Sequence, residues 1–67
     1  MKEEVIKDTI AAAEKEIAKA ELWTELYDHL IEKEDEEKVA TDYKIKKEGL
    51  AKVMEFNKEV VDFLKTK

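Results

Sequence analysis

Apolar residues recur along both halves of the chain at alternating intervals of four and three residues. In the first half, the members of this series are Ile6, Ile10, Ala13, Ile17, Ala20, Thr24, Tyr27 and Ile31. In the second half, they are Val39, Tyr43, Lys46, Leu50, Val53, Asn57, Val60 and Leu64. A heptad spacing of this kind places one stripe of residues along a helix that packs against another helix. The pattern therefore predicts an all-α chain, in which only Thr24, Lys46 and Asn57 interrupt the apolar stripes.

The two series are out of step where they meet, because Ile31 and Val39 are eight residues apart and a continuous heptad would need seven. One long rod would have to absorb a skip residue there, whereas a hairpin needs no adjustment. In a hairpin, facing residues have numbers with a constant sum, and the members of the two series pair with sums of 70 around Asp35. We predict an antiparallel two-helix hairpin with helix one at about 2–33, a turn at about 34–36 and helix two at about 36–66. The rod with a skip residue is the alternative.

The charges around the predicted turn fit the ends of two helices. Lys33 would lie at the negative end of the first helix dipole, and Glu36 and Glu37 at the positive end of the second. Asp35 is the expected N-cap of helix two. One feature counts against a turn here, since no glycine is present to adopt the left-handed conformation that often ends a helix.

Composition supports helices and limits the size of the core. Ala, Glu, Lys and Leu account for 38 of the 67 residues, and the chain has one glycine and no proline. A chain of this length commonly needs disulfides, a metal or an oligomer for stability, and the lack of cysteine closes the first route. The acidic N-terminus does not resemble a signal peptide, and no apolar run approaches the ~18 residues of a membrane span. We therefore expect a cytoplasmic protein with no membrane segment that associates with another chain.

A second group of apolar residues lies beside the predicted stripes, all on one flank of the hairpin. Its members are Trp23, Leu26, Leu30, Ile45, Phe56 and Phe63. The other flank is more polar, with Glu14, Glu21, Asp28 and Lys47, although Met54 and Val61 also lie there. Large exposed apolar faces mark interaction sites.

These six residues form the predicted interface. We expect a homodimer of hairpins, a four-helix bundle in which the turn of one copy meets the termini of the other. The small residues at 11–13 would let the aromatic side chains of the other copy approach closely. Within one chain, Trp23 is expected opposite Gly49, whose bare backbone would accept the indole ring.

The sequence offers little to an enzyme, a metal or a cofactor. It contains no cysteine and no serine, and Thr24 has no obvious base nearby. Glu25 and His29 have the spacing of a ligand pair but occupy positions that point to solvent, and a specific site needs a closed set of ligands. Two polar residues lie in the stripes: Lys46 is expected to extend its charge to water, and Asn57 to fix the register of the helices. We expect a non-enzymatic protein without cofactors.

The charge is unevenly distributed. Residues 1–37 carry 13 acidic residues and five lysines, and residues 38–67 carry eight lysines and five acidic residues. An acidic helix packing beside a basic one explains this simply. The leading interpretation is a small protein–protein interaction module, an adaptor or an inhibitor. The alternative is an RNA-binding hairpin dimer that uses Lys44, Lys47, Lys52 and Lys58, although the chain has no arginine to grip phosphate.

Overall fold

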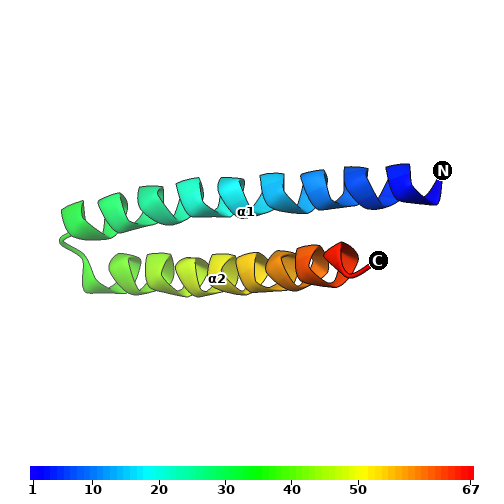
Figure 1. Ribbon diagram of the computed structural model, residues 1–67. Helices are drawn as coiled ribbons and strands as arrows, with labels where there is room; N and C mark the ends of the chain where they lie inside the picture. The colour runs from blue at the N-terminus through cyan, green and yellow to red at the C-terminus, as the bar shows by residue number, and fades with distance from the viewer.

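The chain forms a helical hairpin in the computed structural model, which describes residues 1–67. Helix α1 spans Lys2–Lys33 and helix α2 spans Glu37–Lys65. The helices lie side by side and antiparallel, so that the N- and C-termini meet at one end (Figure 1). The molecule measures 52 × 14 × 12 Å, close to the length expected of one helix of this size. The predicted all-α hairpin is confirmed, and the continuous rod is wrong.

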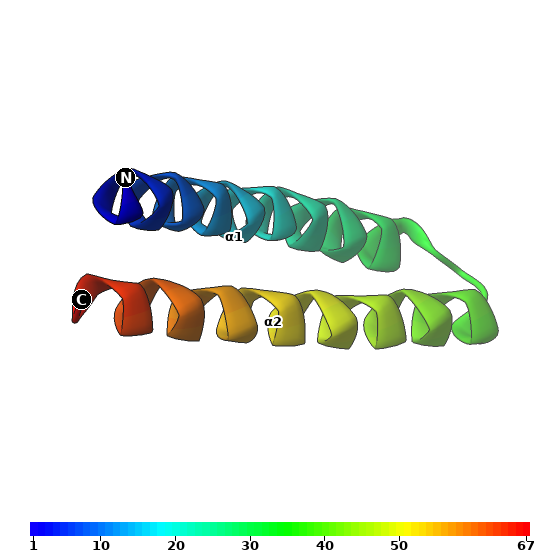
Figure 2. The same ribbon diagram turned by 90° about the vertical axis from the view of Figure 1, so that its right-hand side faces the viewer.

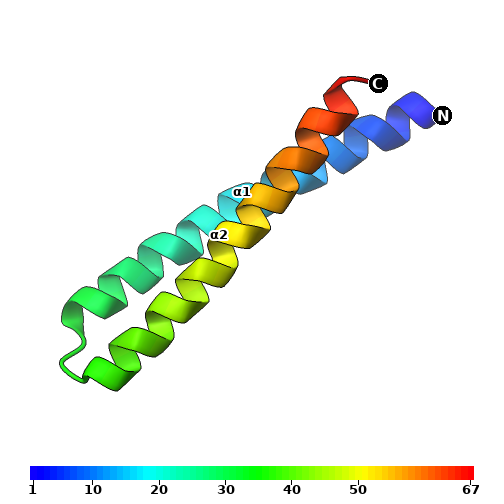
Figure 3. The ribbon, with the colours of Figure 1, turned by 90° about the horizontal axis from the view of Figure 1, so that it is seen from below.

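The two helices cross at a shallow angle, as the turned views make clear (Figures 2 and 3). Near the turn they are displaced sideways from each other, and near the termini one passes over the other (Figure 3). Shallow crossings of this kind are typical of helices that pack through a heptad stripe.

The turn is made by extended residues and needs no glycine. Glu34 ends α1 with φ −83° and ψ 124°, and Glu36 precedes α2 with φ −87° and ψ 114°. The backbone N–H of Glu36 donates to the side chain of Glu34 at 3.0 Å, and no residue has positive φ. The expected capping role of Asp35 is therefore wrong: Glu36 holds the N-cap position of α2 and makes no side-chain capping bond. The reason is that the chain leaves α1 in an extended conformation, which shifts the start of α2 by one residue.

The core follows the predicted stripe of α1 throughout. All eight members of that stripe are buried or half-buried, and Ala13 and Ala20 are the most enclosed at 5% and 3% exposure. On α2 the most enclosed residue is Val61, at 6%. These three are the only buried residues of the chain, because two helices in contact enclose no more than the line between them. The hairpin alone therefore has a very small core.

Helix α2 is rotated about its axis relative to the predicted stripe. Val53 is 42% exposed, so its predicted place in the core is wrong, and Lys46, the polar member of the predicted stripe, is exposed as well. The residues that follow them in sequence, Lys47 and Met54, are half-buried instead. One apolar stripe is as good as the other by spacing alone. The rotation turns the flank that carries Lys47 inward and opens the other flank to solvent.

Specific contacts fix the two helices at this rotation. Tyr27 and Tyr43 pack with ring centroids 5.8 Å apart, as their predicted pairing requires, and Lys47 forms an ion pair with Asp28. The side-chain amide of Asn57 donates to the backbone carbonyl of Val53 in its own helix at 2.8 Å. Asn57 therefore makes no hydrogen bond to α1, and it does not set the register of the hairpin in that way.

Candidate protein-interaction surface

Five of the six residues of the predicted interface are exposed, and Ile45, midway between the half-buried Tyr43 and Lys47, lies on the side of α2 that is turned away from α1. Trp23 is 45% exposed and Leu26 42%, and Leu30 is half-buried. On α2, Phe56 is 66% exposed, and Ile45 and Phe63 are similarly open. Phe56 and Phe63 follow Gly49 at intervals of seven residues, which keeps all three on the same side of the helix.

The rotation of α2 adds residues that the sequence pattern had assigned to the core. Val53 and Lys46 now face the same side as Trp23. Val5 precedes Trp23 by 18 residues, or five helical turns, and is also exposed on this side. We call this surface the Trp23 face; its apolar members are Val5, Trp23, Leu26, Leu30, Val53, Phe56 and Phe63. Of the large apolar residues that are exposed, Met1, Leu22 and Ile45 lie elsewhere.

An open groove of about 570 Å³ runs through the middle of the Trp23 face. Its lining residues are Glu16, Lys19, Ala20, Trp23, Tyr27, Lys46, Gly49, Leu50 and Val53. The prediction that the indole ring of Trp23 packs on the backbone of Gly49 is wrong. Both residues line the groove, but a Cβ atom placed on Gly49 would meet no other heavy atom within 4 Å. The indole of Trp23 packs instead toward Tyr27, with ring centroids 6.1 Å apart, so the space above Gly49 is open.

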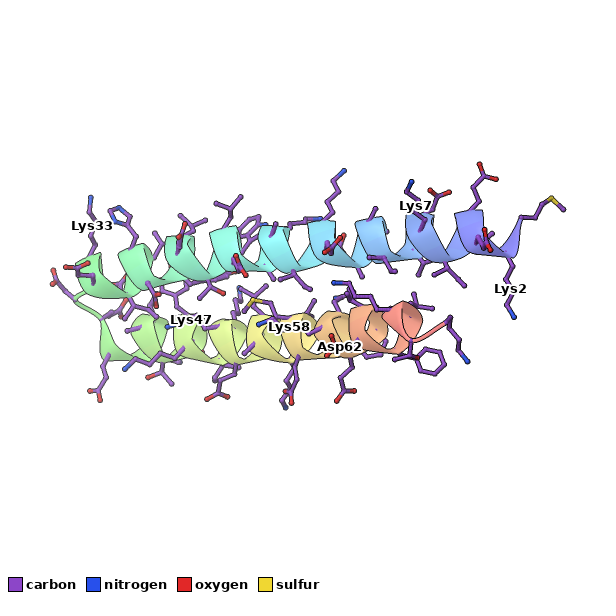
Figure 4. All side chains as sticks on the ribbon, viewed as in Figure 1. Lys2, Lys7, Lys33, Lys47, Lys58 and Asp62 are labelled. Carbon is purple, nitrogen blue, oxygen red and sulfur yellow. The ribbon has the colours of Figure 1, made fainter.

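The opposite side of the hairpin is charged. Asp28 on α1 pairs with Lys47 on α2 through side chains that are 55% and 33% exposed, respectively. We call this side the Asp28 face; it is formed by Glu14, Glu21, Asp28, Lys44, Lys47 and Lys58. Lys47 and Lys58 are 11 residues apart, about three helical turns, and both are labelled in Figure 4. The unequal charges of the two helices thus meet across this face within one chain.

The lysines that could bind nucleic acid are not gathered on a single surface. Lys44, Lys47 and Lys58 lie on the Asp28 face beside acidic residues of α1, and Lys47 is already paired. Lys52 follows Ile45 by seven residues and therefore lies on the side of α2 that is turned away from α1. The basic residues of α2 are thus divided between two sides, and Lys47 forms an ion pair with Asp28.

Comparison with protein-family models, with curated proteins and with solved structures finds no match. No cluster of three or more His, Asp or Glu side chains is placed to hold a metal ion. Neither helix combines the length and apolar character that crossing a membrane requires. The Trp23 face is therefore the feature of the hairpin from which a function can be inferred.

Proposed function

We propose that this protein is a non-enzymatic protein–protein interaction module that uses the Trp23 face to pack against helices of another chain. The observation that carries the proposal is the contrast between a core of three buried residues and seven large apolar residues gathered on one face. A face with this much exposed apolar surface gains free energy when another apolar surface covers it. A four-helix bundle is the usual architecture in which hairpins cover such a face.

In this proposal the hairpin forms a homodimeric bundle and acts on a further protein as an adaptor or an inhibitor. The shape supports this assignment, because a long hairpin presents an extended, regular surface rather than an enclosed pocket. Helices that dock in apolar grooves are recognised through residues spaced by three, four and seven positions. The Trp23 face has that spacing on both of its helices.

Affinity capture with a matched pair of variants tests the proposal. The tagged chain is used to capture proteins from cells of the source organism, alongside Leu26→Lys on the Trp23 face and Leu22→Lys outside it. Both leucines are exposed, so neither substitution removes a core residue, and lysine is nearly as good a helix former as leucine. A protein partner should be captured by the wild type and by Leu22→Lys and lost with Leu26→Lys. Capture of nucleic acid that weakens steeply with salt would favour the RNA-binding alternative instead.

A further inference from the structure

Helix α1 carries a second heptad stripe that no residue of its own chain covers. Its members are Val5, Thr9, Ala12, Glu16, Lys19, Trp23, Leu26 and Leu30, again at alternating intervals of four and three. All are exposed except Leu30, which is half-buried. The first stripe of α1 packs on α2, and this second one runs along the Trp23 face. A helix with two adjacent stripes has two helical neighbours in a bundle.

This second stripe matches its own antiparallel copy. When two α1 helices overlap along their full length, residues whose numbers sum to 35 lie at the same height. Trp23 then faces Ala12 of the second copy, and Leu30 faces Val5. Glu16 faces Lys19 of the second copy. Each pair joins a large residue to a smaller one or an acid to a base.

Other arrangements of the same stripe lose this match. A shift by one heptad in one direction sets Glu16 against Leu26 of the second copy, and a shift in the other sets Lys19 against Thr9. Both leave charges without an opposite charge, which is costly beside apolar groups. If the two turns lay at the same end, α1 would pack on α2 of the second copy. The contact between Tyr27 and Tyr43 fixes the relative heights of the helices, and Glu16 would then lie near Val53.

Helix α2 fits the same two-fold axis. The axis that relates the two α1 helices passes between residues 17 and 18, and the height set by Tyr27 and Tyr43 places it near Val53 on α2. Phe56 of one copy is then level with Gly49 of the other. The phenyl ring is 66% exposed in the hairpin, and the space above Gly49 is open. Glycine allows a neighbouring side chain to approach the backbone closely. Within a helix it is less stable than alanine, and nothing within the hairpin itself requires a glycine at this position.

We propose that the first occupant of the Trp23 face is a second copy of this chain, antiparallel to the first with the turns at opposite ends. Glu16 of each copy pairs with Lys19 of the other, and Phe56 of each enters the groove above Gly49 of the other. This inference rests on the proposed function of the face as a protein-binding surface. It adds the register of the packing, which is the residues that meet across the two-fold axis.

A charge exchange tests the register. Glu16→Lys alone and Lys19→Glu alone each place like charges opposite one another twice per dimer, so each variant should self-associate about tenfold more weakly than the wild type. An equimolar mixture of the two restores both pairs, but only between unlike chains. One variant is labelled with ¹⁵N so that the dimers differ in mass. Native mass spectrometry should then show that heterodimers make up well over one half of all dimers, one half being the fraction expected from random pairing. The same exchange at Glu4 and Lys7, on the other side of α1, should leave the heterodimer fraction at the one half expected from random pairing.

A distance measurement tests the orientation. The chain has no cysteine, so Asp35→Cys provides a single site for a spin label in the turn. With turns at opposite ends, the two labels of a dimer should be roughly 50 Å apart, and with turns at the same end roughly 20 Å. The short distance, or a mixture of charge variants without heterodimer preference, would overturn the proposed register.

The oligomeric state separates this inference from the proposed function. A chain that remains monomeric at ~1 mM by sedimentation equilibrium would overturn the second copy as occupant. The Trp23 face would then still be tested as a binding surface for a different protein by the Leu26→Lys and Leu22→Lys capture. Circular dichroism of every variant confirms that a loss of association is not a loss of helix.

Discussion

The two faces of this hairpin are built from the same two helices but differ in the kind of side chain that each exposes. On the Asp28 face, acidic residues of α1 lie beside lysines of α2, and Asp28 and Lys47 pair within the chain. On the Trp23 face, large apolar residues project from both helices and leave an open groove between them. The charged face therefore has an ion pair within a single chain, whereas the apolar face is left uncovered in a single chain.

This difference between the faces predicts unequal effects of substitutions on folding and on assembly. Exposed ion pairs contribute little to the free energy of folding, since water already solvates both partners. Exposed apolar side chains represent free energy that is released only on burial. Changes on the Trp23 face should therefore have large effects on assembly, and changes on the Asp28 face should have small ones.

The largest effect is expected from Leu26→Lys. In the proposed dimer this substitution places an unpaired charge against apolar side chains at two symmetric sites, which should cost several kcal/mol of assembly free energy. The variant should remain helical at high concentration yet sediment as a monomer. Leu22→Lys is the control, because Leu22 is 67% exposed and lies outside the face. Equal dissociation constants for the two variants would contradict the division into two faces.

A somewhat smaller effect is expected from protein concentration. If folding and association are linked, a hundredfold rise in concentration should add about 2.7 kcal/mol to the stability of the folded state. For a chain of this size that corresponds to a rise in Tm on the order of 10 °C, measured by circular dichroism. Leu26→Lys should abolish this dependence. A wild-type Tm that stays constant over the same range would argue that the Trp23 face is not covered by a second copy.

Gly49→Ala should produce two effects of opposite sign. Within the hairpin, alanine has room at this position and should stabilise α2 by about 1 kcal/mol. In the proposed dimer, the added methyl group occupies the space into which Phe56 of the second copy inserts, so association should weaken. Urea unfolding at low concentration measures the first effect, and sedimentation equilibrium the second. A variant that is more stable and also associates more tightly would show that Phe56 does not enter above Gly49.

The smallest effect is expected from Asp28→Asn on the charged face. The variant removes one exposed ion pair, so the free energy of unfolding should fall by roughly 0.2–1 kcal/mol. The loss should shrink further in 1 M salt, where exposed charges are screened. Chemical unfolding at low and high salt measures both values. A loss of several kcal/mol would mean that the Asp28 face contributes far more to the fold than its exposure suggests.

The hairpin was predictable because the spacing of apolar residues carries the information directly. The stripe of α1 from Ile6 to Ile31 is the stripe that packs, and the break of one residue before Val39 lies across the turn. The exposure of Trp23 and Phe56 was predictable for the same reason. Trp23 and Phe56 are apolar, yet they lie outside the stripe that one neighbouring helix can cover.

The rotation of α2 was not predictable from spacing, and neither was the conformation of the turn. Two adjacent stripes of α2 are about equally apolar, one containing Val53 and the other containing Met54 and Val61. The periodicity of a helix determines which residues share a stripe, but only packing against the side chains of a neighbour selects the stripe that turns inward. Here the burial of Val61 and the ion pair of Asp28 and Lys47 both belong to the stripe that contains Met54 and Val61. Sequence alone thus determined two helices, their pairing and their apolar surplus, and the tertiary structure decided which side of α2 is left open, because that choice depends on shapes that meet only after the chain has folded.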